Sequence, residues 1–279
     1  MHLYKTTKGI LLIHLGNTYA IMEKWDDLIN QPALREYLLN LTEMSSIIPK
    51  DQCKDLLLND LLPPIGTQEV WAAGVTYIRS RDARMNESKD AGGADFYQKV
   101  YEASRPELFF KSLPHRVAGH RQEVRIRKDS EWNVPEPELT LFINATGQIN
   151  AYTIGNDMSS RSIEGENPLY LPQAKVYDKG AALGPCLYIP PGQLSPETHI
   201  TICINRKRDD IFTGIVQLNR MKRKLTELAE YLYREITFTT GCFLMTGTGI
   251  VPPDDFTLQK GDMVTIQIDG IGELINTVG

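Results

Sequence analysis

Short apolar stretches separated by turn residues dominate the chain from residue 70 onward. Alternating or continuous apolar residues over a few positions, bounded by Gly, Pro, Asn or Asp, are typical of strands. Two longer segments, 79–104 and 218–233, instead have the spacing of helices. The predicted strands are 70–75, 108–111, 124–127, 139–144, 148–154, 187–189, 200–205, 243–246 and 264–268. This pattern predicts a mostly-β fold with some α, built as a sandwich or barrel-like core.

The first part of the chain has a different character. Residues 9–14 form an apolar strand candidate, and residues 30–42 place apolar side chains at helical spacing. Pro63-Pro64-Ile65-Gly66 then interrupts regular structure. We therefore expect a small N-terminal α+β domain over residues 1–67 and a larger domain over residues 68–279.

Composition and charge narrow the classes of partner. The 279 residues carry a formal net charge of −5, which does not favour a nucleic-acid partner. The basic run 206–208 leads into two aspartates, as in a turn between strands, and the run 220–224 suits the solvated face of a helix. The longest clear apolar run near the N-terminus, 10–15, is far below the ~20 residues that span a bilayer, so we expect no membrane partner.

The four cysteines are scattered and show no metal-binding spacing. They stand at positions 53, 186, 203 and 242, without a CxxC or Cys/His pair. A chain that is neither short nor rich in cysteine does not suit a disulfide framework. We expect reduced thiols and a cytoplasmic protein.

Two carboxylates stand at the entrance of one predicted strand. Glu136 and Glu138 flank Pro137 just before the apolar run 139–143. Residues i and i+2 of a strand project to the same face, so both carboxylates point together. They repel each other unless one is protonated or a cation lies between them, and a hard divalent ion with oxygen ligands fits. Alone, this pattern is equally typical of a solvated edge with two acids.

A third carboxylate approaches through a predicted hairpin. The turn Ala145-Thr146-Gly147 joins the strand after Glu138 to the strand 148–154, and Asp157 follows that second strand. In antiparallel pairing Asp157 returns toward Glu136. Mg²⁺ takes few carboxylates and leaves sites for substrate oxygens and water, which suits such a cluster.

At this point the chain resembles the fumarylacetoacetate hydrolase superfamily. The matching segments are RPELFFK at 105–111, PEPEL at 135–139, GNDMSSR at 155–161, QAKVYD at 173–178, LGP at 183–185 and TGTGIV at 246–251. The resemblance covers roughly residues 68–279 and implies the mixed β-sandwich or roll of that family's C-terminal domain. The segments SEWNVPEPE at 130–138 and EGENPLYLPQAK at 164–175 are similar to its 2-keto-3-deoxy-D-arabinonate dehydratase branch.

The resemblance implies a role for individual residues. It identifies Glu136, Glu138 and Asp157 as ligands of Mg²⁺, with Mn²⁺ as the alternative metal. It places Lys175 beside the metal, facing a small-molecule 2-keto acid. The other implied residues are Glu107 and Glu164 for acid–base duty, and Tyr77, Arg81, Arg161 and Thr248 for substrate binding.

One departure from the hydrolase relatives bears on the reaction. Acylpyruvate hydrolases carry a water-activating His three residues after the tyrosine of their lid, and Ser80 stands there in this chain. The resemblance therefore favours dehydration of a 2-keto-3-deoxypentonate to 2,5-dioxopentanoate in pentose catabolism. An acylpyruvate hydrolase, an oxaloacetate decarboxylase and a catalytically silent keto-acid sensor remain the alternatives. We also expect a lid over residues 78–98 that orders with substrate, and a homo-oligomer, either dimer or tetramer.

Overall fold

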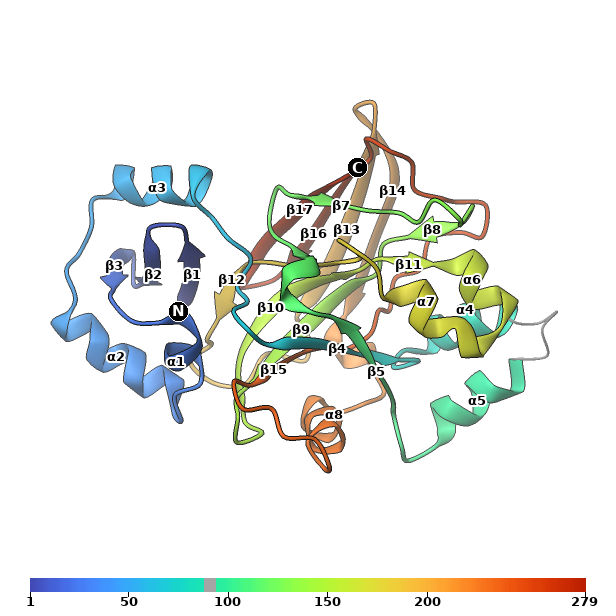
Figure 1. Cartoon of the computed structure of the whole chain (residues 1–279), viewed down its shortest axis with the longest axis horizontal. Coiled ribbons are helices and arrows are strands. Elements are labelled where there is room, and N and C mark those ends of the chain that lie inside the picture. Colours follow the sequence, from blue (N-terminus) through green and yellow to red (C-terminus); the bar gives the residue numbers. More distant parts are fainter. Residues whose placement is uncertain (88–93) are drawn as a thin grey trace.

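The computed structural model describes residues 1–87 and 94–279, and within them it forms three sheets with helices at their edges and faces (Figure 1). The strands are β1 His2–Thr6, β2 Gly9–His14, β3 Asn17–Ile21, β4 Glu69–Gly74, β5 Glu107–Ser112, β6 Val117–Ala118, β7 Glu123–Val124, β8 Asn133–Val134, β9 Pro137–Ile143, β10 Ile149–Asp157, β11 Ser159–Ser160, β12 Ala181–Tyr188, β13 His199–Arg206, β14 Asp209–Gln217, β15 Cys242–Met245, β16 Met263–Ile268 and β17 Gly272–Val278. The α-helices are α1 Trp25–Ile29, α2 Leu34–Met44, α3 Lys50–Asn59, α4 Ile78–Glu87, α5 Ala94–Glu102, α6 Arg161–Glu166, α7 Leu171–Lys175 and α8 Leu225–Leu232. Short 3₁₀ turns are Pro114–Arg116, Pro168–Tyr170 and Leu218–Arg220.

The largest sheet runs through the whole molecule. Its main strand order is β3-β2-β1-β12-β10-β9-β15-β4-β5, with β6 paired to β12. A five-stranded sheet, β14-β13-β16-β17-β7, lies beside it, and β11 and β8 form a small third sheet. The predicted mostly-β fold with some α is confirmed. Because β1 pairs antiparallel with β12, the N-terminal hairpins extend the large sheet.

Strand β9 separates two hydrophobic cores. Its side chains alternate between the two faces of the sheet, as the twofold period of a strand requires. Leu139, Leu141 and Ile143 join the core shared with the five-stranded sheet. Phe142 points the other way, into the core formed with the N-terminal helices, which contains Leu28. A strand buried on both faces explains the continuous apolar run in this part of the sequence.

The register of β9 and β10 fixes the position of the polar residues at their ends. The predicted antiparallel hairpin is confirmed, and it pairs Leu139 with Ile154 and Glu138 with Gly155. Beyond the ladder, Glu136 and Asp157 exchange backbone hydrogen bonds of 3.2 and 3.0 Å. The carboxyl-bearing ends of the two strands therefore meet at one edge of the structure.

Several predicted elements need correction. The predicted helix 218–233 is wrong at its start, because Lys222 donates its backbone N–H to Thr76 and α8 begins only at Leu225. Arg223 is buried and donates to the carbonyls that end α5, so the basic run 220–224 is not wholly a solvated face. Of the predicted strand 124–127, only Val124 lies in β7.

Other features of the fold agree with the sequence or stay open. The turn predicted after Arg206 is confirmed, with Lys207 and Arg208 at φ 53° and 80° between β13 and β14. The predicted helix 79–104 appears as α4 and α5, and residues 88–93 between them lie outside the described residues, as does that part of the expected lid. The division into domains at residues 67 and 68 stays a prediction. No described helix has both the length and the apolar character needed to cross a membrane.

The double-sided burial of β9 predicts a large stability loss on truncation. Leu141 is completely buried between the two main sheets, so Leu141→Ala should lower the free energy of unfolding by about 2–5 kcal/mol through lost burial and a residual cavity. Met22→Ala, at a side chain that is 93% exposed, serves as the control and should change it by less than about 0.5 kcal/mol. Urea unfolding followed by circular dichroism measures both, and equal midpoints would contradict the assignment of Leu141 to the core.

Candidate active site

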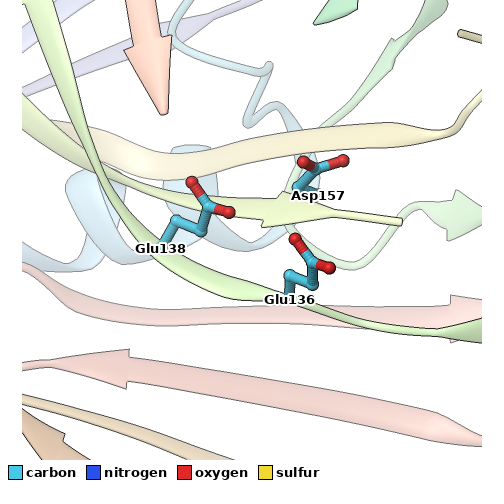
Figure 2. Close-up of side chains that lie close together, drawn as sticks. All are labelled: Glu136, Glu138 and Asp157. Carbon is cyan, nitrogen blue, oxygen red and sulfur yellow. The ribbon is translucent and has the colours of Figure 1, made fainter. Parts of the chain in front are cut away.

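Three buried carboxylates converge at the shared end of β9 and β10. One oxygen from each of Glu136, Glu138 and Asp157 lies within 4.8 Å of the other two (Figure 2). The side chains are 5%, 1% and 1% exposed, so water screens their mutual repulsion poorly. The sequence predicted that Asp157 returns toward Glu136, and this proximity is confirmed.

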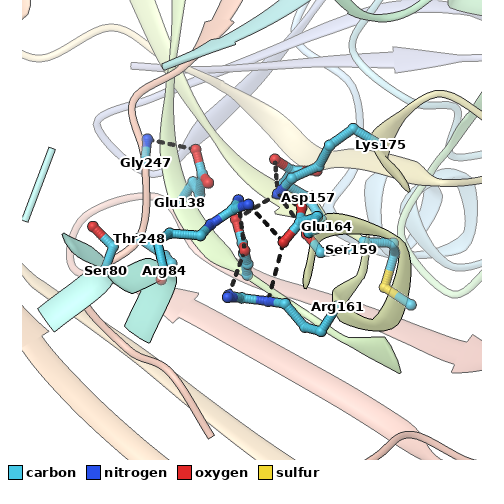
Figure 3. Close-up of polar contacts among 12 residues, drawn as sticks. Ser80, Arg84, Glu138, Asp157, Ser159, Arg161, Glu164, Lys175, Gly247 and Thr248 are labelled. Carbon is cyan, nitrogen blue, oxygen red and sulfur yellow. Dashed lines mark hydrogen bonds and ion pairs between the residues drawn. The ribbon is translucent and has the colours of Figure 1, made fainter. Parts of the chain in front are cut away.

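Two buried lysines form ion pairs with this cluster. Lys175, at the end of α7, donates from its Nζ to Glu136 Oε2 at 2.9 Å, to Asp157 Oδ2 at 3.0 Å and to the Ser159 hydroxyl at 2.5 Å (Figure 3). Lys111, near the end of β5, pairs its Nζ with Asp157 Oδ1 at 2.5 Å. It also donates to the backbone carbonyl of Lys175 at 2.5 Å. Lys111 thus ties Asp157 to the segment that carries Lys175.

A second layer of ion pairs joins two arginines to the same cluster. Arg161, the first residue of α6, donates to Glu136 Oε1 at 2.7 Å. Arg84 of α4 pairs its Nη1 with Glu164 Oε2 at 2.6 Å. Glu164 in turn lies 3.5 Å from Lys175 Nζ (Figure 3). Helices α4, α6 and α7 are therefore held to the carboxylates of β9 and β10 by charge.

The ionisation of the carboxylates differs within the cluster. Burial, followed by the charges of Asp157 and Glu136, raises the pKa of Glu138 well above its usual value. Burial also acts on Glu136, but the charges of Lys175 and Arg161 outweigh it and hold the pKa of Glu136 below its usual range. The two pKa values differ because Glu136 pairs directly with Lys175 and Arg161, whereas Glu138 has no lysine or arginine partner in the described part of the chain. Glu138 instead accepts the Gly247 N–H at 2.6 Å.

This arrangement fits a divalent metal ion. Three carboxylates that cannot all stay charged without further compensation, with oxygens close enough to share one ligand, form the donor set that Mg²⁺ and Mn²⁺ prefer. Glu138 and Asp157 lie on β9 and β10, and Glu136 directly precedes β9, so paired strands position the donors, which favours a preformed site. Glu136, Glu138 and Asp157 are the residues that would hold the ion.

Two of these carboxylates, Glu136 and Asp157, line a small cavity together with Lys175. Its volume is about 10 Å³, close to the minimum for one water molecule. Ser80 and Arg84 of α4 and Thr248 also belong to its lining, and Figure 3 shows Thr248 beside the two α4 residues. The expected 2-keto acid is larger than this volume.

Backbone geometry at the cavity wall is unusual. Val75 has φ 55°, a left-handed conformation that a β-branched residue rarely adopts. Gly247 has φ 91°, and a Cβ there would come within 2.9 Å of the Ala73 carbonyl oxygen. Strained backbone that the surrounding fold enforces is concentrated at functional sites.

The remaining substrate-binding candidates occupy different positions. Tyr77 is 2% exposed, and its hydroxyl has no hydrogen-bond partner among residues 1–87 and 94–279. Thr248 is buried and exchanges hydrogen bonds of 3.1 Å with the backbone of Ile250. Arg81 is not brought to the cluster: it pairs with Asp82 at 2.6 Å and lies over the Tyr101 ring. The binding role of Arg81 stays a prediction.

Helix geometry identifies a residue that the sequence reasoning missed. Residues i and i+4 of a helix share a face, so the residue above Ser80 is Arg84, whereas Arg81 points about 100° away. Arg84 is 8% exposed and reaches Glu164 and Glu136. The spacing of residues 80 and 84 was the available signal.

The expected acid–base residue Glu107 lies next to the cluster. It begins β5 opposite Gly74 of β4, and a Cβ at Gly74 would fall 2.0 Å from its Oε2. Burial raises the pKa of Glu107, while the charges of Arg84 and Lys175 act in the opposite direction. Ser80 donates its hydroxyl to the Tyr77 carbonyl at 2.9 Å and so completes the first turn of α4.

Comparisons with known proteins were made for the whole chain. The family model described as "Fumarylacetoacetate (FAA) hydrolase C-terminal" matches residues 83–279. A Haloferax volcanii protein named "Probable 2-keto-3-deoxyxylonate dehydratase" is 46% identical over 216 residues, which cover 77% of this chain and 73% of that protein. The 2-dehydro-3-deoxy-D-arabinonate dehydratase of Saccharolobus solfataricus is 42% identical over 230 residues, covering 81% and 77%.

A solved structure extends the similarity to the full fold. The 2-keto-3-deoxy-D-arabinonate dehydratase complexed with magnesium and 2,5-dioxopentanoate superposes with a TM-score of 0.85 at 33% identity. The match covers 99% of this chain and 97% of that chain. The N-terminal part therefore shares the fold of that enzyme as well.

Metal binding should stabilise the folded protein through Glu138. Adding Mg²⁺ after chelation should raise the melting temperature, because a ligand at 100 times its Kd stabilises by about 2.7 kcal/mol. Glu138→Gln should abolish most of this rise, since it removes a charged ligand while keeping the shape of the side chain. Differential scanning calorimetry measures it, with the exposed Glu131→Gln as the matched control. An unchanged response in Glu138→Gln would contradict the metal site.

Proposed function

Because this chain belongs to the fumarylacetoacetate hydrolase family, we propose that it is a Mg²⁺-dependent hydro-lyase that dehydrates a 2-keto-3-deoxy sugar acid. A 2-keto-3-deoxypentonate such as 2-keto-3-deoxy-D-arabinonate is the substrate, and 2,5-dioxopentanoate is the product. The observation that carries the proposal is the buried carboxylate triad with Lys175 beside it, in a chain 42% identical to a dehydratase of this class.

Glu136, Glu138 and Asp157 hold the metal ion in this proposal. Bound Mg²⁺ supplies Lewis-acid polarisation of the substrate's ketone, which makes the neighbouring C3 protons more acidic. The charge of the ion also offsets the repulsion that raises the pKa of Glu138. The residues around it bind the sugar acid, position it and move its protons.

The substrate's carboxylate and hydroxyl groups meet polar side chains of the cavity wall. Thr248 lines the cavity, and the buried Tyr77 hydroxyl, which has no partner in the described part of the chain, is available to a substrate oxygen. Arg161 supports the site by holding Glu136. Arg84 exchanges Glu164 for the substrate's carboxylate when the cavity opens. Arg81 can contact the substrate only if α4 moves, because it is paired with Asp82 away from the carboxylate cluster.

Proton transfer is assigned to Glu107 and Lys175. A carboxylate whose pKa is raised by burial is a better base near neutral pH, so Glu107 removes the C3 proton. Burial lowers the pKa of Lys175, but Asp157 and Glu136 outweigh it and raise the pKa above its ordinary value. Lys175 therefore stays an ammonium. In this proposal it donates its proton to the departing C4 hydroxyl, which leaves as water, and Glu164 lies 3.5 Å from its Nζ.

The second half of the conversion needs no further cofactor. Loss of the C3 proton and the C4 hydroxyl leaves a C3–C4 double bond. Removal of a C5 proton and return of a proton to C3 move that double bond to C4–C5. The resulting enol becomes the aldehyde of 2,5-dioxopentanoate. One base and one acid that exchange protons with the substrate are sufficient for both steps.

Hydrolysis of an acylpyruvate fits the site less well. That reaction needs a base that activates water, and a positioned base contributes ~10²–10⁴-fold. The Ser80 hydroxyl instead donates within the first turn of α4. None of the chain's five histidines, at positions 2, 14, 115, 120 and 199, lines the cavity.

The same proposal places the protein in its cellular setting. We infer a cytoplasmic enzyme of pentose catabolism, consistent with four cysteines that are all free. A homo-oligomer, dimer or tetramer, is part of the proposal.

A panel of substrates tests the reaction class. With Mg²⁺, a 2-keto-3-deoxypentonate should be converted to 2,5-dioxopentanoate at least about 100-fold faster in kcat/KM than acetylpyruvate or oxaloacetate, because cleavage of those compounds lacks a positioned base. Product formation is followed by mass spectrometry. Faster turnover of acetylpyruvate would assign the enzyme to the hydrolases.

Lys175→Met tests the proposed proton donor. The substitution should lower kcat by about 10²–10⁴-fold, the usual contribution of a positioned acid or base. The Mg²⁺-dependent rise in melting temperature should persist, because lysine is not a ligand of the metal. Lys128→Met, at an exposed lysine, should retain wild-type kinetics. Full activity of Lys175→Met would rule out its catalytic role, and a lost Mg²⁺ response would make it a residue that holds the metal site together.

A further inference from the structure

An open cleft lies next to the small cavity that Glu136 and Asp157 line. Its volume is about 600 Å³, far larger than the roughly 10 Å³ of the cavity. Tyr77 and Gly249 line the cleft, whereas their close neighbours in the chain, Ser80 and Thr248, line the cavity. The two spaces therefore lie on opposite sides of the same two segments. We call this space the entrance cleft, defined by Tyr77, Arg79, Asp82, Tyr101, Arg220 and Lys222.

The wall between the two spaces is thin and tightly packed. A Cβ at Gly249 would come within 2.7 Å of the Tyr77 ring, so the ring lies directly on the backbone of this glycine. Burial and then the charge of Glu138 raise the pKa of Tyr77, which indicates that its hydroxyl feels the carboxylate cluster. The side chain of Tyr77 thus adjoins the cleft and also the site.

The entrance cleft carries an excess of positive charge. Arg79, Arg220 and Lys222 are exposed cations in its lining. Its acidic member, Asp82, is already paired with Arg81 at 2.6 Å. Lys222 is anchored, because its Nζ donates to the Tyr101 carbonyl and lies 4.4 Å from the centre of the Tyr101 ring. The side chains of Arg79 and Arg220 make no hydrogen bond or ion pair within residues 1–87 and 94–279.

This local charge opposes the charge of the whole chain. At a formal net charge of −5, the protein as a whole repels an anion. A cleft of opposite sign concentrates anions at its mouth and raises their rate of capture. The two arginines with unpaired side chains lie in the same cleft lining as Tyr77 and are placed to do so.

We propose that the entrance cleft is an anion-collecting vestibule that binds the carboxylate of small 2-keto acids before they pass Tyr77 into the carboxylate cluster. The inference rests on the proposed function in one respect, which is that the substrate carries a single negative charge. It adds Arg79 and Arg220 as residues that set the affinity for the substrate without touching the reacting atoms.

The size of the effect follows from elementary electrostatics. A unit charge about 10 Å from the substrate's carboxylate in water changes its local concentration about twofold. Neutralising two charges should therefore lower kcat/KM about fourfold, and reversing both should lower it about tenfold or more, at low ionic strength. At about 0.5 M salt the screening length falls to a few ångströms and the differences should vanish.

The experiment compares four proteins at about 10 mM and about 500 mM ionic strength. They are the wild type, Arg79→Gln/Arg220→Gln, Arg79→Glu/Arg220→Glu and the control Lys50→Gln/Lys54→Gln. The control removes two positive charges from exposed positions of α3, which lies at the opposite end of the molecule from α4 in Figure 1. We expect kcat to stay unchanged in all four and kcat/KM to fall only in the arginine variants, only at low ionic strength.

A measurement without turnover separates this inference from the proposed reaction. Calorimetric titration of the Mg²⁺-loaded proteins with pyruvate, a 2-keto acid with no hydroxyl to eliminate, should give the same graded loss of affinity. Absence of turnover in the wild type would contradict the proposed dehydratase function. The pyruvate titration would then still test whether the entrance cleft binds anions. An equal affinity in all four proteins, an equal loss in the α3 control, or a loss that persists at 500 mM ionic strength would overturn the vestibule.

Discussion

Compensation of buried charge is the constraint on which this structure depends. Five carboxylates and four cationic side chains gather at one edge of the large sheet. The carboxylates belong to Glu107, Glu136, Glu138, Asp157 and Glu164, and the cations to Arg84, Lys111, Arg161 and Lys175. Counted formally they leave one negative charge, which a divalent ion converts to one positive charge. A monoanionic 2-keto acid then brings the site to neutrality, so metal and substrate complete a balance that the protein leaves open.

In the proposed function, the same buried ion pairs also determine which ligand can enter the site. Breaking a buried pair by removing one partner costs about 3–5 kcal/mol, because the other charge stays buried and unpaired. Arg84 can leave Glu164 cheaply only if another anion replaces that carboxylate. The carboxylate of the substrate is such an anion. In the proposed function, release of Arg84 from Glu164 is therefore coupled to the arrival of the substrate's carboxylate.

Local sequence pattern predicted the parts of the fold that local physics controls. The apolar runs on either side of Ala145-Thr146-Gly147 specified a hairpin, and its antiparallel register was enough to bring Asp157 to Glu136. The pattern failed for β14, where every residue is exposed or partly buried, and for β17, where the polar Asn276 occupies a buried position and interrupts the apolar alternation. It also could not separate Lys222 from the following helix, because a backbone hydrogen bond to the distant Thr76 decides where α8 begins.

For the site, sequence supplied the residue types and structure supplied their partners. Arg81 and Arg84 are equally basic, and only the start of α4 decides which one faces the carboxylates. Lys111 left no signal beyond its resemblance to a family segment, because its contacts with Asp157 and Lys175 join three separate parts of the chain.

The pairing of β9 with β10 also determines where this chain can change its length. Successive side chains of β9 enter different environments: Leu139 and Leu141 lie between the sheets, and Glu138 lies among the charges. Removing a single residue after Glu138 and before Leu141 would shift the pairing by one on one side of the deletion and turn the side chains of that part to the other face. Either a carboxylate would then enter an apolar core or a leucine would meet the charges. Insertions and deletions should therefore be confined to the turn at residues 145–147, and the strand itself can vary only by substitution.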